Sequence, residues 1–503
     1  MTDARTQRDG GGAERSDLDA ATTGAPPDAR SRLRQQILPD WSNRSLVAVW
    51  IARVSMSAGR ALAAVVAPVY LARLGYSGLR LGEMFAVIAI AAAALSAVVG
   101  LLSDRIGRRP FLIVFPLLTA GAALVFATNE PTWVLFAAAS VGSFGRGAGA
   151  GAGAVGPYQP AESALVTELA PARVRNVIFG RLAFGSSLGA LLGGLLAVAT
   201  DAGTGNHGAA LVSAFRPAFL VIALVSLLAG GVALAVTEPS RPERTTHHAD
   251  GTKRTRFPRR SLPLLVRLWV SNSVNGLAIG MFGPFVTYWF YRRYGAGPGE
   301  IGALFAVINL VTLASTLSAA GMAKRWGLVR TVSVVRVAQA VLLVPMVLAP
   351  SFLAAGAIYL VRMVVQRAGL PLRQSYVLAM ADPEERSSVA ALANIPSQVA
   401  MAASPIASGY LLEEVSLSLP FEIAGGLQLV NAVTFWVFFR HRPPAEETAG
   451  AGSGAERPAA LPQQEMLPRR EMAPRSGGDR RQAEHVDTPG GPTSRRLGDD
   501  PHG

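Results

Sequence analysis

Apolar runs of about 20 residues recur along most of the chain and are separated by short polar segments. A helix needs about 20 apolar residues to cross the ~30 Å hydrocarbon core of a bilayer, where its backbone bonds are satisfied internally. The pattern therefore predicts an all-α membrane protein with twelve transmembrane helices. The expected bounds lie near Leu46–Leu71, Leu81–Ser103, Phe111–Thr128, Trp133–Val155, Val177–Ala199, Phe215–Val236, Leu268–Phe290, Ile301–Ala323, Val329–Leu348, Phe352–Leu370, Val389–Leu411 and Leu419–Phe439.

The second half of this pattern repeats the first. The segment LGEMFAVI at Leu81–Ile88 matches IGALFAVI at Ile301–Ile308 in five of eight positions, at an offset of 220 residues. The same offset places Gly75 on Gly295. Two six-helix repeats in the same orientation are typical of a secondary transporter whose site lies between the halves.

Polar segments divide the chain into five parts. The tails contain too few apolar residues to form a core of their own, so we expect them to be disordered. The predicted parts are a cytoplasmic tail over residues 1–44, an N-terminal bundle over 45–237, a cytoplasmic loop over 238–262, a C-terminal bundle over 263–440 and a second cytoplasmic tail over 441–503.

The net charge of +14 alters this picture little, because the basic residues lie in short loops beside apolar runs and in the tails. The loops DRIGRR, ARVR and KRWGLVR all fall on one side of the predicted membrane. The positive-inside rule then places both termini in the cytoplasm of a multi-pass plasma-membrane protein, and nucleic-acid binding is not expected. The absence of cysteine excludes disulfides, iron–sulfur clusters and thiol catalysis.

One of these loops carries a specific motif, GLLSDRIGRRP at Gly100–Pro110. A tight turn between two spans favours glycine at Gly107, and the arginines suit lipid phosphates or carboxylates. Together with the twelve spans, the motif resembles the signature of the major facilitator superfamily. Within that family, spans 4 and 5 of this chain are similar to those of bacterial drug and metabolite efflux members. The resemblance covers Leu46 to about Arg440 and implies the two-bundle fold of that family.

The resemblance implies a gating role for this loop. Asp104 stands at the C-terminal end of its own helix, which is unfavourable for a carboxylate, so we expect it to face another helix N-terminus. The family pattern places that N-terminus near Ser387 or Ser388, while Lys324 replaces the aspartate in the second repeat. An alternative is that the loop only fixes the topology. The predicted gating residues are Gly100, Asp104, Arg105, Gly107, Arg108 and Arg109.

Two glycine-rich segments interrupt the apolar pattern. GSFGRGAGAGAGAVGP in the fourth span is interpreted as a helix with a smooth face, because small residues let helices approach closely. GSSLGALLGG at Gly185–Gly194 is similar to the antiporter motif of drug exporters, although Ala190 stands where that motif has proline. Helix packing explains this segment equally well.

Several arginines fall inside the predicted spans. An arginine at mid-bilayer costs roughly 2.5–3.5 kcal/mol on insertion scales, so it needs a partner or a wet cavity. By resemblance, spans 1, 4, 7 and 10 line the central cavity. Few acids balance these arginines, so we expect a positive cavity that suits an anionic or acceptor-rich solute. A purely structural role is the alternative, and Arg336 is expected to snorkel to the membrane surface. The predicted substrate-binding residues are Arg53, Arg60, Arg146, Asn272, Asn275 and Arg362.

Proton coupling would need a titratable group in the pathway, and the two candidates are Glu162 and Asp104. No catalytic triad, metal cluster or phosphate-binding loop is present in the sequence, so neither an enzyme nor a cofactor is expected.

These observations favour a monomeric secondary transporter that exports a small organic solute by alternating access, with protons as candidate coupling ions and membrane lipids as surroundings. One alternative is an organic-anion permease or exchanger without proton coupling. A more remote alternative is a non-transporting receptor or scaffold that signals through its C-terminal tail.

Overall fold

The computed structural model describes residues 43–128, 131–144, 156–170, 174–201, 211–238, 260–315, 328–380, 385, 389 and 392–440, all within one compact unit. Across these ranges the regular elements are helices, and at least one helix occupies each of the twelve predicted spans. The all-α fold class is thereby confirmed. The predicted tails and central loop fall almost entirely outside the described residues.

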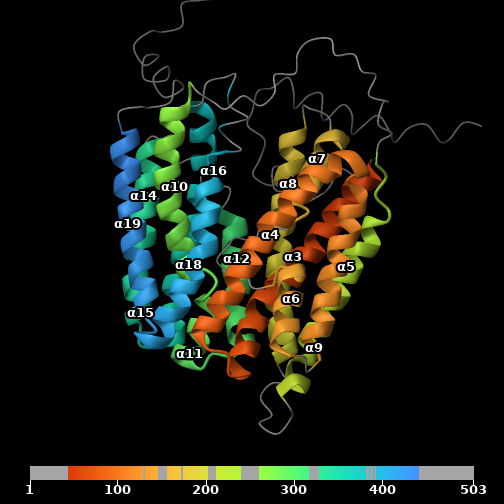
Figure 1. Ribbon diagram of the computed structural model, residues 1–503, viewed down its shortest axis with the longest axis horizontal. Helices are drawn as coiled ribbons and strands as arrows, with labels where there is room; N and C mark the ends of the chain where they lie inside the picture. Colours follow the sequence, from red (N-terminus) through yellow and green to blue (C-terminus); the bar gives the residue numbers. More distant parts are fainter. Residues whose placement is uncertain are drawn as a thin grey trace, which may run out of the picture. The chain divides into compact units, whose positions relative to one another are not determined.

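The first half of the chain contributes seven of the described helices, coloured red to yellow-green in Figure 1. Six of them correspond to the predicted spans, and α7 follows the fourth. Their bounds are α3 Arg44–Arg73, α4 Gly78–Ile106, α5 Arg109–Phe126, α6 Thr132–Gly142, α7 Gln159–Leu169, α8 Arg175–Asp201 and α9 Leu211–Ala233.

The second half contributes the green to blue helices (Figure 1). Two of its spans are broken, each beside a proline. Pro284 follows α10, and Pro345 in α15 cannot donate a backbone hydrogen bond to Val341. The bounds are α10 Leu262–Phe282, α11 Val286–Tyr294, α12 Pro298–Ser315, α14 Leu328–Val341, α15 Leu343–Leu348, α16 Phe352–Met380, α18 Ile395–Glu414 and α19 Leu419–Phe439.

By length and composition, eight helical segments of the described part could cross a membrane. The fourth span differs from the prediction: α6 ends at Gly142, and Ser143 adopts a left-handed conformation with φ of 53°. A residue in this conformation cannot continue a right-handed helix, so α6 stops before Ser143. Residues 145–155, which include Arg146, lie outside the described residues.

The helices have two distinct ends. We call the end with Arg108, Arg260 and Glu385 the basic side, and the opposite end, where α8 and α18 finish and α4 and α12 begin, the far side. Within the unit, α8 packs on α12 and α4 packs on α18, so these pairs join the two halves.

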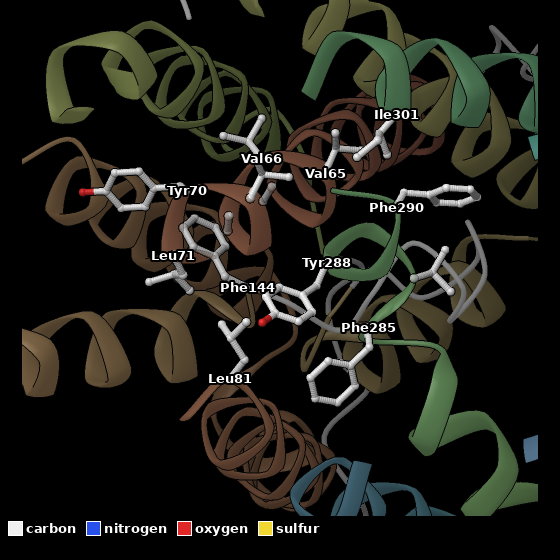
Figure 2. Close-up of a cluster of buried hydrophobic side chains, with 14 of the residues drawn as sticks. Val65, Val66, Tyr70, Leu71, Leu81, Phe144, Phe285, Tyr288, Phe290 and Ile301 are labelled. Carbon is white, nitrogen blue, oxygen red and sulfur yellow. The ribbon is translucent and has the colours of Figure 1, made fainter. Parts of the chain in front are cut away.

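The largest buried apolar cluster also belongs to both halves. In Figure 2, Val65 of α3, Phe285, Tyr288 of α11 and Ile301 of α12 project into this one cluster. Phe85 of α4 packs edge-on against Phe285, with ring centroids 5.2 Å apart. Close packing of these aromatic side chains gives van der Waals and aromatic contacts that help to hold the halves together.

The glycines of α8 explain its contact with α3. Gly185, Gly189 and Gly193 are spaced by four residues and therefore share one helix face. A Cβ atom on Gly185 would lie 2.8 Å from the indole nitrogen of Trp50, and one on Gly189 would overlap the carbonyl oxygen of Val54. The segment GSSLGALLGG thus acts in helix packing, one of the two interpretations that the sequence allowed.

Candidate functional site

A cavity of about 1130 Å³ lies between α4, α7 and α18. Its size is that of a site for a drug-sized organic molecule. Among the described residues, its wall contains small and branched apolar side chains together with neutral polar ones, and no charged side chain. The lining residues are Ala86, Ile90, Ala93, Ala94, Ser96, Ala97, Gly156, Gln159, Pro160, Ser163, Asn394, Ile395, Gln398, Val399, Ala402, Ala403 and Ile406.

Polar and apolar groups occupy different ends of this cavity. Because α4 runs from the far side to the basic side and α18 runs back, Ala86 and Ile406 mark the far end of the cavity. Ser96, Asn394 and Gln398 lie toward its basic end, where α7 adds further polar side chains. The cavity can therefore accept a solute with an apolar body and one polar, uncharged end.

Arg60, one of the predicted cavity arginines, lies beside this wall. Its Nη1 atom lies 3.0 Å from the position that a Cβ atom on Gly156 would occupy, and Gly156 lines the cavity. Gly156 has a φ of 119°, a conformation that favours glycine. The turn before α7 therefore brings the main chain close to the guanidinium group.

Arg53, the second predicted arginine of α3, is engaged in a buried ion pair. Its Nε atom donates to Oε1 of Glu162 at 2.9 Å, and its Nη2 atom donates to Oε2 of the same carboxylate at 2.5 Å. Nη1 donates to the Ser186 hydroxyl at 3.3 Å. These contacts join α3, α7 and α8. Glu162 thus balances the charge of Arg53, and the predicted role of Arg53 in substrate binding stays a prediction.

Arg362 of α16 is completely buried but does not belong to the lining of this cavity. Its guanidinium carbon lies 4.1 Å from the ring centroid of Phe282, and its Nε atom donates to the Gln339 carbonyl at 3.2 Å. Within the described part of the chain, Nη1 and Nη2 have no hydrogen-bond partner. The cation–π contact with Phe282 partly compensates for burial of the charge.

Asn272 and Asn275 of α10 make contacts within the second half. The Asn272 amide donates to the Ala393 carbonyl at 2.7 Å. The Asn275 oxygen accepts from the Asn431 amide at 3.2 Å, and Asn431 in turn accepts from Arg336 at 2.7 Å. Arg336 is thus buried in a hydrogen-bond network rather than snorkelling. Asn431 was not among the residues predicted from the sequence, although a polar residue in the middle of an apolar span is a signal for such a role.

The predicted gating loop is organised by a carboxylate, Glu238, that was not predicted from the sequence. The backbone N–H groups of Arg108 and Arg109 donate to the Glu238 carboxylate at 3.1 and 3.4 Å. Gly107 has a φ of 111°, as its predicted turn role requires, and a Cβ atom there would lie 3.0 Å from Glu238. Glu238 therefore caps the N-terminus of α5, where a negative charge is favourable.

The other gating residues are placed only in part. The Arg108 side chain pairs with Glu168 at 2.5 Å, Arg105 is exposed, and no described atom would lie within 4 Å of a Cβ on Gly100. The side chain of Asp104 lies outside the described residues, as do its expected partners Ser387 and Ser388. The predicted Asp104 contact therefore stays a prediction.

Glu385 makes an analogous contact on the basic side of the second half. Its Oε1 and Oε2 atoms accept from the backbone N–H groups of Arg260 at 3.2 Å and Ser261 at 2.8 Å, immediately before α10. Desolvation opposes ionisation, but the hydrogen bonds from Ser261 and Arg260 outweigh it and lower the pKa of Glu385 from 4.5. The ionised carboxylate therefore stabilises the start of α10.

We expect the Glu385→Gln variant to melt at a slightly lower temperature than the wild type at pH 7. The stabilisation is complete above the unfolded-state pKa near 4.5 and is lost as the pH falls through the lower folded-state value. Wild type and variant should therefore converge in thermal melts at acidic pH. An equal difference in melting temperature between wild type and Glu385→Gln at both pH values would contradict this role. Glu414→Gln serves as the control.

Three comparisons relate the chain to known proteins. The chain is 22% identical over 408 residues to the multidrug resistance protein MdtG of Proteus mirabilis, covering 79% of this chain and 96% of that protein. It is 22% identical over 356 residues to an uncharacterised membrane protein of Saccharomyces cerevisiae, covering 65% and 78% of the two chains. The crystal structure of the D323A mutant of the nucleoside transporter NupG matches with a TM-score of 0.61 and 13% identity, over 79% of this chain and all of that one.

The sequence profile of the Major Facilitator Superfamily matches residues 49–270 and again residues 268–473, once for each half of the chain. This double match corresponds to the duplicated helical pattern and to the helices found at the predicted spans. The chain is therefore a multi-pass membrane transporter of small molecules, not an enzyme, and it belongs to the Major Facilitator Superfamily.

Proposed function

We propose that this transporter exports uncharged, amphipathic organic solutes from the cytoplasm across the plasma membrane in exchange for protons. The observation that carries the proposal is the cavity of about 1130 Å³, whose lining contains no charged side chain within the part of the chain that the structure describes. Its amide and hydroxyl groups suit a solute rich in hydrogen-bond acceptors. The similarity to a multidrug resistance protein supports the outward direction.

The proposed topology places the basic side in the cytoplasm. The arginines near α5 and α10 then lie on the side that the positive-inside rule requires. In this orientation both termini are cytoplasmic and the cavity receives its solute from the cytoplasm. We propose that a single copy performs transport, because each chain contains both halves and the cavity between them.

The proposed coupling site is the pair of Arg53 and Glu162. Glu162 is a buried carboxylate on α7, the helix that supplies Gln159 and Ser163 to the cavity wall. Protonation of Glu162 would break its charge interaction with Arg53 and release the contact between α3 and α7. A change in the protonation of Glu162 would therefore move α7 and with it the part of the cavity wall that α7 supplies.

The test is solute transport in proteoliposomes with an imposed pH gradient. The double variant Arg53→Gln/Glu162→Gln removes both charges together, so it avoids leaving one charge buried alone. We expect it to retain solute exchange at equal pH. The rate of its gradient-driven export should fall to about one tenth of the wild-type rate or lower. Gradient-driven export at the wild-type rate would overturn the coupling proposal, and Glu422→Gln, an exposed carboxylate, is the control.

One observation favours the organic-anion permease as a second candidate. The guanidinium group of Arg60 lies against Gly156 at the cavity wall and could attract an anion there. Under the first proposal, Arg60→Gln leaves export of neutral dyes within about twofold of the wild type. If the protein is an anion carrier instead, the wild type transports labelled carboxylates and Arg60→Gln abolishes that transport.

A further inference from the structure

Two carboxylates on the far side occupy equivalent places in the two halves. Asp201, the last residue of α8, accepts a hydrogen bond from the backbone N–H of Gly299 in α12 at 2.9 Å. Glu413, near the end of α18, accepts one from the backbone N–H of Gly78 in α4 at 2.8 Å. Each bond joins one half of the transporter to the other.

The partners of these carboxylates are the N-termini of long helices. Gly78 is the first residue of α4, and Gly299 is the second residue of α12. The first N–H groups of a helix have no acceptor within it and carry a partial positive charge, which favours a carboxylate. A carboxylate here both satisfies a backbone donor and gains from the helix dipole.

Glycines bring the helix ends close enough for these bonds to form. A Cβ atom on Gly82 of α4 would overlap the carbonyl of Pro405 in α18, and one on Gly302 of α12 would lie 2.7 Å from the carbonyl of Gly194 in α8. Gly82 and Gly302 are separated by 220 residues, which is the offset of the internal repeat. The two repeats therefore make equivalent close backbone contacts, α4 with α18 and α12 with α8.

The position of the Asp201 carboxylate also depends on small residues at the start of α12. A Cβ atom on Gly299 would lie 2.5 Å from Oδ2 of Asp201, and one on Gly297 would lie 3.3 Å from it. A side chain at Gly299 would displace the carboxylate from the helix N-terminus. The sequence GPGE at the start of α12 thus leaves room for an acidic side chain from the opposite half.

We propose that Asp201 and Glu413 are paired gate residues that hold the far side closed while the cavity is open toward the basic side. Alternating access requires the halves to separate at the far side, and both bonds must then break. Because the two bonds form only when the far side is closed, their whole interaction free energy favours the closed state over the open one. This role does not depend on which solute is carried or on proton coupling.

The expected effect follows from the size of charge interactions at helix ends. Loss of one carboxylate should raise the ratio of far-side-open to far-side-closed molecules by about two- to fivefold. Because the two bonds lie in different helix pairs, their effects should be nearly additive in free energy. The double variant Asp201→Asn/Glu413→Gln should therefore raise that ratio by about tenfold.

The experiment uses spin labels across the far side. The chain contains no cysteine, so Thr132→Cys in α6 and Leu353→Cys in α16 introduce the only two labelling sites, one in each half. Electron–electron double resonance then gives the distance distribution between the labels in the folded full-length protein. We expect one main distance in the parent and a growing second population at longer distance in Asp201→Asn, Glu413→Gln and the double variant.

Matched variants separate a gate from a general structural role. Glu414→Gln neutralises the residue next to Glu413, for which no hydrogen bond is found among the described residues, and it should leave the distribution unchanged. The population at longer distance should be larger in Asp201→Ala than in Asp201→Asn, because asparagine keeps an acceptor oxygen at the helix N-terminus. A distribution in the folded double variant equal to that of the parent would overturn the proposal, as would an equal shift in Glu414→Gln.

A second measurement covers the case in which the double variant folds poorly. Ala86 lines the far end of the cavity, so a thiol placed there reports opening of the far side. In the single variant Asp201→Asn, labelling of Ala86→Cys by an impermeant maleimide from the far side should be about two- to fivefold faster than in the parent. An unchanged labelling rate would refute the role of Asp201.

Discussion

Replacement of Glu162 by glutamine should destabilise the folded transporter by about 3–5 kcal/mol, because it leaves the charge of Arg53 buried and unpaired. Arg53 and Glu162 are both almost completely buried and joined by two hydrogen bonds. The bond to the Ser186 hydroxyl at 3.3 Å cannot replace the lost charge. The measurement is thermal unfolding in detergent together with the yield of monodisperse protein.

The double variant Arg53→Gln/Glu162→Gln provides the matched control for stability. It removes both charges while keeping polar side chains at both positions, and replacement of a buried ion pair as a unit is often close to neutral. We expect it to melt at a temperature much nearer to the wild type than either single variant. If each single variant were as stable as the double one, the pair would not be coupled in the way the geometry indicates.

The second large effect is expected at the contact between α3 and α8. Gly189→Ala would place a methyl group against the carbonyl oxygen of Val54. The methyl group would also lie only 2.7 Å from the Cβ atom of Ser57, which is closer than the van der Waals contact of two carbon atoms allows. Backbone atoms cannot move aside as a flexible side chain can, so α8 must shift away from α3. Overpacking of this kind costs about 1–3 kcal/mol. Thermal unfolding and folded yield measure the effect.

The same helix offers a matched control for this substitution. Among the described residues, no atom would lie within 4 Å of a Cβ atom on Gly180, so Gly180→Ala adds a methyl group without a steric clash there. Alanine is also the better helix former by about 1 kcal/mol. Gly180→Ala should therefore be neutral or slightly stabilising. Equal losses at Gly180 and Gly189 would show that helix contact is not the cause.

The sequence was most informative where membrane physics acts locally. The apolar runs predicted a helix at each of twelve places, and Gly107 was expected in a tight turn where its φ is 111°. Breaks within spans were less visible, although Pro284 and Pro345 mark two of them. The fourth span was predicted as one helix through Val155, but α6 ends at Gly142.

The candidate site was predicted less well, because side-chain partners depend on helix packing. Arg53 was expected to line a positive cavity, yet Glu162, 109 residues away, neutralises it. Glu238 was overlooked because its contact with Arg108 spans 130 residues. Arg362 was correctly seen as deep in the fold, but the rotation of α16 directs it to Phe282 rather than to the cavity between α4 and α18.

The sequence by itself determined that this protein is a duplicated helical membrane transporter, because span length, repeat offset and loop motif are properties of short segments. Only the tertiary structure decided which charges meet, which walls form the cavity, and that Asp201 and Glu413 occupy the N-termini of α12 and α4. The reason is physical: bilayer thickness constrains each helix separately, whereas pairing between distant residues depends on the rotation and register at which helices pack.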